Sequence, residues 1–246
     1  SEGYYGGQGS GAVGWAPIMG VGYYQPVAQW SKGEYANANN TQDDLSIIVN
    51  NNNSVDYRAD DTGATLATAR YLELYSDSTA SAEGVIETTG DTDAFRFSTT
   101  GGAISLSAAP VGDWADLAVT ATLADASDTI IASNNPQTQL GASIATNLSA
   151  GTYTFRVTGA GRNNPLTDGF SSYASLGYYS VSGSVAGGVL PSRFTVLETA
   201  TNTTVVGAVT ATNLGVDPLV YVITSGNTSG AFALNNSGVL TVANAA

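Results

Sequence analysis

The sequence predicts a mainly β protein built around an antiparallel sandwich. Glycine accounts for 29 of the 246 residues, only 11% of residues are charged, and the helix-favouring Lys, Glu, Arg and Met are scarce. Between residues 84 and 183, short runs alternate apolar and polar residues with period two. Gly, Asn and Asp punctuate these runs about every ten residues, which is typical of short strands that bury one face in a shared core.

Charge and composition exclude several classes of function. The formal net charge is -13, from 20 acidic and 7 basic side chains, and the basic residues are scattered singly, so we expect no binding to nucleic acid or to anionic membranes. No apolar run approaches the roughly 20 residues that span a bilayer. The chain has no Cys and no His, which excludes disulfides, a Ser-His-Asp triad and a His-Glu-x-x-His zinc site within it. The acidic, Lys-poor composition fits a secreted or cell-surface protein, and we expect any signal peptide to lie before Ser1.

The first 55 residues are rich in glycine and aromatic residues, which predicts mainly loops. One helix is expected at about residues 41–49. Asn40 and Thr41 would cap it, Asp43 and Asp44 would lie in its first turn, and it would end before the asparagine run at 50–53.

One stretch in this region, Gly14–Tyr24, contains Met19, the only methionine of the chain, in a Pro-Ile-Met-Gly turn. Taken alone, Met19 is a flexible apolar side chain that fills a gap in a core. Together with residues 29–35 and 39–45, however, the stretch resembles the end of the catalytic domain of secreted bacterial metzincin-type zinc metallopeptidases.

This resemblance implies that Met19 is the remnant of a Met-turn beneath a metal site. The zinc ligands would lie in a part of the parent protein upstream of Ser1, so zinc belongs only to that missing part, and this chain is expected to be inactive alone. Whether the parent is an active enzyme stays open, because Gln8 stands where such loops have His. Tyr23 and Tyr24 are expected to be packing residues. The whole segment is expected to dock on the neighbouring sandwich or to stay disordered.

A second unit is expected at residues 56–187. It opens with residues 64–72, which fit either a short connecting helix or an extended lead-in. The expected strands then follow at residues 84–87, 93–97, 103–106, 117–123, 143–146, 152–157 and 178–183.

Four motifs in this unit occur in a characteristic order: residues 90–97, 116–117, 148–153 and 168–179. Together they resemble the bacterial pre-peptidase C-terminal (PPC) domain. The resemblance implies a jelly-roll-like antiparallel β-sandwich that is appended to a secreted protease.

A third unit, residues 188–246, follows a Gly-Gly and Pro break. Five short strands are expected at residues 194–198, 205–213, 219–223, 230–234 and 238–242. They resemble the first two thirds of a cadherin-like repeat, which implies a partial cadherin- or Ig-like β-sandwich. Such a partial sandwich has an unpaired edge, which we expect a longer parent chain or a partner strand to complete.

Calcium is the candidate cation, because the chain offers metals only oxygen ligands. The carboxylates considered lie in acidic turns, where the alternative is an Asp side chain that caps backbone amides. The cadherin-like resemblance adds three further ligands, but Gly215 and Asn213 replace acidic residues there, so binding should be weak or absent. The candidates are Asp60 and Asp61, Asp91, Asp93, Asp113, Asp116 and Asp168, with Glu198, Asn213 and Asp217 from the resemblance.

Two further groups of side chains were weighed. The carboxylates of Glu34 and of Asp43 and Asp44 are interpreted as structural. Tyr173, Tyr178 and Tyr179 form a candidate groove for glycan or protein, although alternation along a strand turns one of such a pair inward.

The combined reading is a non-catalytic C-terminal region of a secreted or cell-surface zinc metallopeptidase. It would act as an accessory binding or adhesion module for protein or polysaccharide at the cell surface. The alternative is a structural or adhesive, filament-forming surface protein of β-sandwich units that self-associate through sheet edges and are stabilised by calcium.

Overall fold

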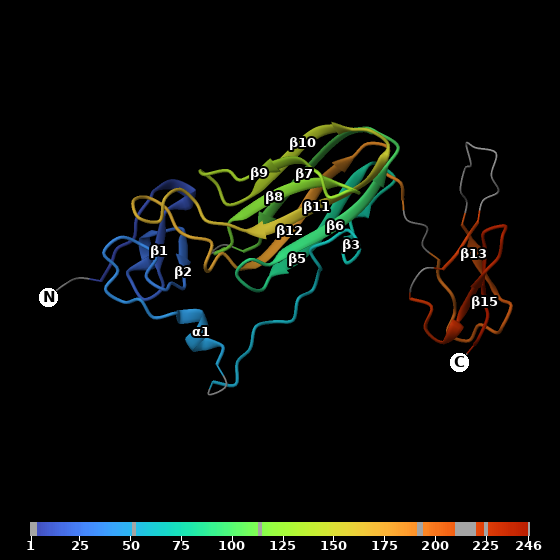
Figure 1. Ribbon diagram of the computed structural model, residues 1–246, viewed down its shortest axis with the longest axis horizontal. Helices are drawn as coiled ribbons and strands as arrows, with labels where there is room; N and C mark the ends of the chain where they lie inside the picture. The colour runs from blue at the N-terminus through green and yellow to red at the C-terminus, as the bar shows by residue number, and fades with distance from the viewer. Residues whose placement is uncertain are drawn as a thin grey trace. The chain divides into compact units, whose positions relative to one another are not determined.

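The computed structural model describes residues 4–50, 53–112, 115–190, 194–209, 220–223 and 226–245 (Figure 1). The chain forms two compact units, Ser1–Leu190 and Pro191–Ala246. Below they are called unit 1 and unit 2. The expected boundary between residues 55 and 56 lies inside unit 1 and stays a prediction. Within the described residues, no helix has the length and apolar character needed to cross a membrane.

The first part of unit 1 consists of short elements joined by loops. They are the 3-10 turns η1 (Gly11–Val13) and η2 (Gly22–Tyr24), the parallel strand pair β1 (Trp15–Pro17) and β2 (Val27–Gln29), and helix α1 (Asp44–Ile48). The helix is shorter than expected and begins later. Its N-cap is Asp43, whose side chain accepts a hydrogen bond from Ser46 N, and not the Asn40–Thr41 pair.

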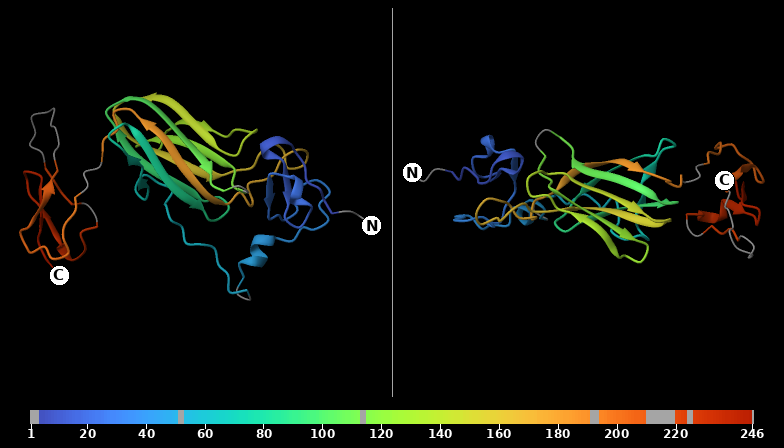
Figure 2. Two further views of the ribbon diagram at one scale, coloured as in Figure 1. Left: turned by 180° about the vertical axis from the view of Figure 1, so that it is seen from behind. Right: turned by 90° about the horizontal axis from the view of Figure 1, so that it is seen from above.

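The rest of unit 1 is a sandwich of two five-stranded sheets that lie face to face (Figures 1 and 2). One sheet has the order β10-β7-β12-β5-β4 and the other the order β3-β6-β11-β8-β9. All strand pairs are antiparallel except β3 with β6. The strands are β3 (Arg70–Tyr71), β4 (Glu73–Leu74), β5 (Thr79–Ile86), β6 (Thr92–Thr99), β7 (Gly102–Pro110), β8 (Val119–Asp125), β9 (Ile130–Asn134), β10 (Ala142–Leu148), β11 (Gly151–Gly159) and β12 (Gly177–Val185).

The alternation of side chains explains why these residues form a sandwich. In β7, Ile104, Leu106 and Ala108 are buried while Ser105 between them is exposed. Successive side chains of a strand point to opposite faces, so each strand gives one apolar row to the core. The mainly β fold class is therefore confirmed. The core between the sheets includes Leu72, Phe95, Phe97, Ile104, Leu106, Leu123, Ile144, Tyr153, Phe155, Val157, Tyr179 and Val185.

All seven strands expected between residues 84 and 183 are present, most of them longer than the patterns indicated. Neither the short helix nor an extended stretch fills residues 64–72: residues 64–68 form bends and a turn in which Ala69 N donates to Thr65 O (2.7 Å), and β3 follows at Arg70–Tyr71. Strand β9 was not expected. Its residues Ile130 and Ile131 are both exposed, so it lacks the one-sided apolar pattern that marks a strand in sequence.

The N-terminal part packs on one end of the sandwich, as expected (Figure 1). Trp15, Val27 and Tyr35 are buried together with Ala118 and Phe170 of the sandwich region. Hydrogen bonds add to this contact. Gln29, whose Oε1 accepts from Trp15 Nε1 (2.9 Å), donates through Nε2 to Asp116 O. Tyr173 OH accepts from Leu45 N (2.8 Å) and donates to Asp43 Oδ1 (2.6 Å). An aromatic cluster and buried hydrogen bonds thus join the two parts of unit 1.

Unit 2 contains one three-stranded sheet in the order β13-β15-β14. The strands are β13 (Val205–Ala208), β14 (Phe232–Leu234) and β15 (Val239–Val242). The expected strand at 194–198 is wrong, and so is the one at 219–223 for its described residues 220–223. Among the described residues of unit 2, Val242 is the only buried apolar one. Without the long apolar rows of unit 1, these segments gain little from pairing.

Candidate metal centre

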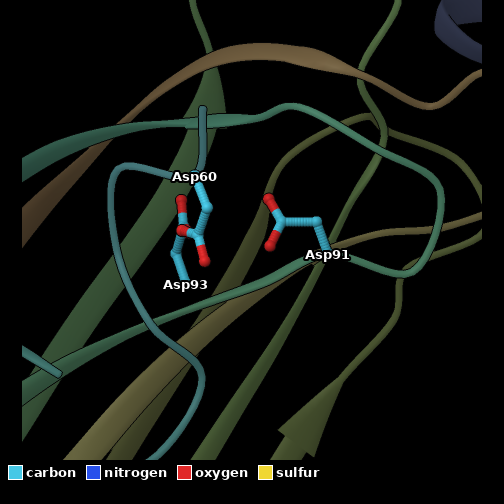
Figure 3. A group of neighbouring side chains, drawn as sticks. All are labelled: Asp60, Asp91 and Asp93. Atoms are coloured by element: carbon cyan, nitrogen blue, oxygen red, sulfur yellow. The ribbon is translucent and has the colours of Figure 1, made fainter. Parts of the chain in front are cut away.

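Three carboxylates meet at the end of the sandwich where β6 begins (Figure 3). Asp60 comes from the segment between α1 and β3, called the lead-in segment below, Asp91 from the turn between β5 and β6, and Asp93 from β6 itself. One oxygen atom of each lies within 4.8 Å of the others. Two further carboxylates, Asp61 and Glu87, lie close enough to influence this group electrostatically. We call these five residues the acidic cluster.

The backbone around the acidic cluster fixes where its side chains point. Asp60 Oδ1 accepts a hydrogen bond from Thr62 N (2.8 Å), and Ala94 N of β6 donates to Gly63 O (3.3 Å), which ties the lead-in segment to the sheet. The Asp91 carboxylate accepts a bond from Glu87 N (3.3 Å) across the turn. Asp91 and Asp93 are therefore presented on the same side as Asp60.

Asp93 points into the interior from β6 and is fully buried. Its Oδ2 accepts a hydrogen bond from Tyr179 OH of β12. Gly84 on β5 makes room for this pair, because a Cβ there would lie 2.2 Å from Tyr179 OH and 2.7 Å from Asp93 Oδ2. The two sheets thus cooperate to hold one carboxylate oxygen of Asp93, while the other remains available.

Several oxygens of the acidic cluster are buried without a hydrogen-bond partner among the described residues. They are Asp93 Oδ1, Asp61 Oδ1 and both carboxylate oxygens of Glu87. Buried polar atoms in folded proteins are nearly always hydrogen-bonded, and an unpaired one costs about 1–3 kcal/mol. The unpaired oxygen of Asp93, a residue whose carboxylate lies beside those of Asp60 and Asp91, therefore points to a ligand that accepts electron pairs from oxygen.

Burial and mutual repulsion also shift the titration of the cluster. Burial raises the pKa of Asp93 to about 8, against the opposing effect of the Tyr179 hydrogen bond, and nearby Asp91, Asp61 and Glu87 raise it further. Burial raises the pKa of Glu87 to about 7, with Asp91 and Asp61 adding to the effect. Arg70 lies near the site, where its Nη1 donates to Thr62 Oγ1 (3.4 Å), but it forms no ion pair with the cluster in the described part of the chain.

The geometry fits a hard divalent cation. Two oxygens that both bind one Ca²⁺ at about 2.4 Å are at most about 4.8 Å apart, and the three carboxylates satisfy this limit. Ca²⁺ accepts an irregular set of six to eight oxygens, whereas Mg²⁺ needs near-octahedral geometry and zinc prefers nitrogen or sulfur. Asp60, Asp91 and Asp93 would be the direct ligands, and Asp61 and Glu87 would complete or support them.

The other expected calcium ligands that the structure describes do not join this group. Asp116 Oδ1 accepts from Ala28 N (3.3 Å) where the N-terminal part meets the sandwich, and burial raises the pKa of its carboxyl to about 6. Asp168 is exposed and accepts from Thr167 Oγ1 (2.9 Å) and Asn164 N (3.4 Å), as in the turn interpretation. Glu198 is exposed in unit 2. Asp113, Asn213 and Asp217 lie outside the described residues.

Glu87 is the member of the cluster that the sequence interpretation missed. It directly follows the buried pair Val85–Ile86 and is itself only 7% exposed. A charged residue that continues a buried apolar run, four positions before Asp91, is the signal that identifies it in the sequence.

The expected aromatic groove is not formed. Tyr173 and Tyr179 are buried, and only Tyr178 is exposed, beside Arg58, whose Nη1 donates to its hydroxyl (2.7 Å). The expectation for Tyr23 and Tyr24 is also wrong, because both side chains are more than 80% exposed. Side chains alternate between the two faces of a strand, and this alternation turns Tyr179 inward. Tyr23 and Tyr24 lie in the 3-10 turn η2, where no such alternation predicts which side chain is buried.

Met19 is exposed as well, and so does not fill a gap in the core. It follows β1 in the turn where Gly20 N donates to Pro17 O (2.8 Å). The turn expected from the sequence is present, but its methionine faces solvent in this chain.

Without a metal, we expect the stability of unit 1 to fall as the pH rises from 5 to 8. Asp93 and Glu87 have folded-state pKa values of about 8 and about 7, above their ordinary values, so the folded state holds protons that the unfolded chain has released. Their stabilising contribution is complete below the unfolded pKa and is lost as the pH passes the folded one. Urea midpoints measured in EGTA at several pH values test this, and Asp93→Asn should flatten the profile. An unchanged slope in that variant contradicts the assignment.

Sequence and structure searches place the chain only loosely among known proteins. No family model matches the sequence, and no curated protein does. Among solved structures, the pre-peptidase C-terminal domain of a collagenase from Bacillus anthracis matches with 18% identity and a TM-score of 0.34, over 47% of this chain and 93% of that domain. The periplasmic lysozyme inhibitor PliG from Aeromonas hydrophila matches with 13% identity and a TM-score of 0.30, over 47% of this chain and 97% of the inhibitor. Scores this low carry no functional argument.

Proposed function

We propose that this chain is a calcium-stabilised, non-catalytic accessory region of a secreted or cell-surface metallopeptidase. The observation that carries the proposal is the acidic cluster, in which the fully buried Asp93 has an unpaired oxygen and its carboxylate lies within 4.8 Å of those of Asp60 and Asp91. The resemblance of the Met-turn segment and of the ordered sandwich motifs supports the link to a peptidase. The sequence contains no His or Cys to hold a catalytic zinc, which supports an accessory and not a catalytic role.

A bound calcium ion would link two parts of unit 1, because its ligands come from both. Asp60 belongs to the segment that runs from α1 to the sandwich, whereas Asp91 and Asp93 belong to the sandwich. Residues 53–60 of that segment are exposed throughout, so little apolar burial holds them in place. A cation shared by both parts would fix the end of the segment and neutralise the repulsion among five carboxylates. The adjoining modules would then be held in a defined arrangement for binding or adhesion.

Thermal unfolding with and without calcium tests the proposal. All three tryptophans, at positions 15, 30 and 114, lie within residues 1–190, so their fluorescence reports on unit 1. At a calcium concentration about 100 times the Kd, binding to the folded state adds about 2.7 kcal/mol, which corresponds to a rise in Tm of roughly 5–10 °C for a unit of this size. Asp91→Asn should remove most of the rise.

The matched control is Asp168→Asn, which changes an exposed aspartate of a turn outside the cluster. It should keep the full calcium response. If calcium does not change the Tm of the wild type, or if Asp91→Asn and Asp168→Asn respond alike, the acidic cluster does not bind calcium. Magnesium at the same concentration should give a smaller rise, because three carboxylates from separate segments provide an irregular site.

A structural or adhesive role is the second candidate, and the surface of unit 2 favours it. Leu197, Val205, Val220 and Val222 are more than 60% exposed. The sheet edges are less open than expected: β13 has an irregular register beside Gly207, and the Asn227 side chain bonds to both N and O of Phe232 in β14 (2.9 and 2.8 Å). If unit 2 self-associates, we therefore expect contact through its apolar side chains and not through strand pairing. Sedimentation velocity over a range of protein concentrations tests whether copies associate.

A further inference from the structure

The N-terminal part of unit 1 contains a hollow of about 880 Å³, well apart in sequence from the acidic cluster. Its described walls come from Tyr4 and Tyr5, Pro17 and Met19, Asp44, and five residues between positions 31 and 40, which are Ser31, Tyr35, Asn37, Asn39 and Asn40. Small-molecule sites typically have volumes of about 300–1,000 Å³ and combine apolar walls with a few polar groups. This hollow therefore has the size of a ligand site, and its lining can be compared with the chemistry of ligand classes.

The floor of the hollow is rigid and partly aromatic. Tyr35 is 9% exposed and stacks on Tyr5, with 4.7 Å between ring centroids. Behind it lies Trp15, 5.4 Å from Tyr35 between ring centroids. Ser31 is also buried, and its N–H donates to Asp44 Oδ2 (3.0 Å), which fixes the wall formed by the start of α1. A ligand would thus meet a preformed surface, which lowers the entropy cost of binding.

The rim of the hollow combines apolar side chains with amides. Tyr4, Met19, Asn37, Asn39 and Asn40 are the exposed residues among its lining. The side chains of Asn37 and Asn39 form no hydrogen bond within the described part of the chain. Each amide group offers two donors and one acceptor oxygen, a combination that matches neighbouring hydroxyl groups on one molecule.

Charge limits the ligand class further. No described residue that lines the hollow is cationic, and the chain as a whole has a net charge of -13, so an anionic ligand would find no partner. Asp44 is the one carboxylate among the described lining residues, and its Oδ2 accepts a bond from Ser31 N. The amides of Asn37, Asn39 and Asn40 outnumber this single charge, which favours a neutral ligand over a cationic one.

The nearby backbone is not open for a peptide that adds a strand. Gln8 and Trp15 exchange two hydrogen bonds of 2.8 Å on the outer side of β1. On β2, Asp116 Oδ1 accepts from Ala28 N (3.3 Å). Recognition in the hollow must therefore use side chains, which suits a ligand that carries both apolar faces and hydroxyl groups.

We infer that this hollow binds a neutral oligosaccharide. A sugar ring presents C–H groups on its face and hydroxyls at its edge, so the Tyr4 ring would contact the face and the amides of Asn37 and Asn39 would bond to the hydroxyls. This inference rests on the proposed accessory role and deepens it by naming the class of ligand.

Calorimetric titration of the full, calcium-saturated chain with three neutral tetrasaccharides tests the inference. The probes are cellotetraose, maltotetraose and N-acetylated chitotetraose, with tetragalacturonate and an uncharged tetrapeptide as comparators. At least one neutral sugar should bind with a Kd between about 10 µM and 1 mM. Side-chain amide signals of Asn37 and Asn39 should shift in NMR spectra on binding.

Two variants and a matched control locate the site. Tyr4→Ala and Asn39→Ala should each weaken binding about 5- to 10-fold, since an aromatic contact or hydrogen bond contributes about 1 kcal/mol. Tyr23→Ala removes a tyrosine of similar exposure outside the hollow and should change the Kd by less than about twofold.

Three results would overturn the inference. They are no binding of any neutral tetrasaccharide at about 5 mM, an equal loss in Tyr4→Ala and Tyr23→Ala, or binding of the tetrapeptide or tetragalacturonate that matches the best sugar. A calcium-dependent rise in Tm that persists without sugar binding would remove this inference and leave the calcium proposal standing.

Discussion

Replacing Arg162 by methionine is expected to lower the free energy of unfolding of unit 1 by about 4 kcal/mol. Arg162 is fully buried, and its five N–H groups donate to five oxygens. Methionine has similar bulk but no N–H donor, so each of these oxygens would lose its bond from Arg162, although Leu140 O would keep its bond from Val119 N (2.7 Å). The acceptors are the backbone oxygens of Gln139 (2.9 Å), Gly161 (2.9 Å), Val119 (2.8 Å) and Leu140 (2.8 Å), and Asn135 Oδ1 (2.8 Å).

Replacing Arg162 by lysine separates the contribution of the hydrogen-bond geometry from that of the positive charge. No carboxylate pairs with Arg162 in the described chain, and burial lowers its pKa to about 10, so it remains charged at neutral pH. Arg162→Lys keeps the charge, but three donors on one nitrogen cannot reach five acceptors spread around a planar group. We therefore expect Arg162→Lys to recover only a small part of the loss.

Urea unfolding followed by tryptophan fluorescence measures both variants. The control is Arg58→Met, which removes an exposed arginine that bonds to Tyr178 OH and should cost less than about 1 kcal/mol. A cost for Arg162→Met no greater than that of Arg58→Met would show that the hydrogen-bond array does not stabilise the fold.

The sandwich could be predicted from the sequence because its signal is local. In strands such as β11, apolar residues occupy every second position, as Tyr153, Phe155 and Val157 do, with polar residues between them, and this period is visible without knowledge of any partner strand. Strand β9 and the strands of unit 2 lack that one-sided pattern. Arg162 resembled any of seven scattered basic residues, because its role depends on loops that only the fold brings together.

The acidic cluster was predictable in part for the same reason. Asp91 and Asp93 are two positions apart, and Asp60 and Asp61 are adjacent, so each pair could be named from the sequence. That the two pairs share one site depends on the path of the lead-in segment along β6, which no local pattern encodes. Burial of Asp93 against Tyr179 of a third segment likewise follows only from the packing of the two sheets.

Calcium is expected to slow tryptic cleavage after Arg58 about 100-fold when its concentration is about 100 times the Kd. Arg58 lies in an exposed segment, two residues before Asp60 and three before Asp61. A protease must take several residues around the cleaved bond into its own site, so Asp60 and Asp61 must leave the acidic cluster first. Bound calcium stabilises the closed state by the free energy of binding, and the population of the open state falls by the corresponding factor.

Cleavage after Lys32 provides an internal control, because trypsin itself responds to calcium. Lys32 is exposed in a loop of the N-terminal part and contributes nothing to the acidic cluster. The quantity to measure is therefore the ratio of the two cleavage rates, followed by mass spectrometry.

Calcium should lower the ratio of Arg58 to Lys32 cleavage in the wild type and in Asp168→Asn, and should leave it unchanged in Asp91→Asn. A ratio that does not respond to calcium in the wild type would mean that the lead-in segment is not held by a metal, whatever calcium does to Tm. Because Asp91 is outside the cleaved segment, a loss of protection in Asp91→Asn can only arise through a ligand shared between the turn and the lead-in.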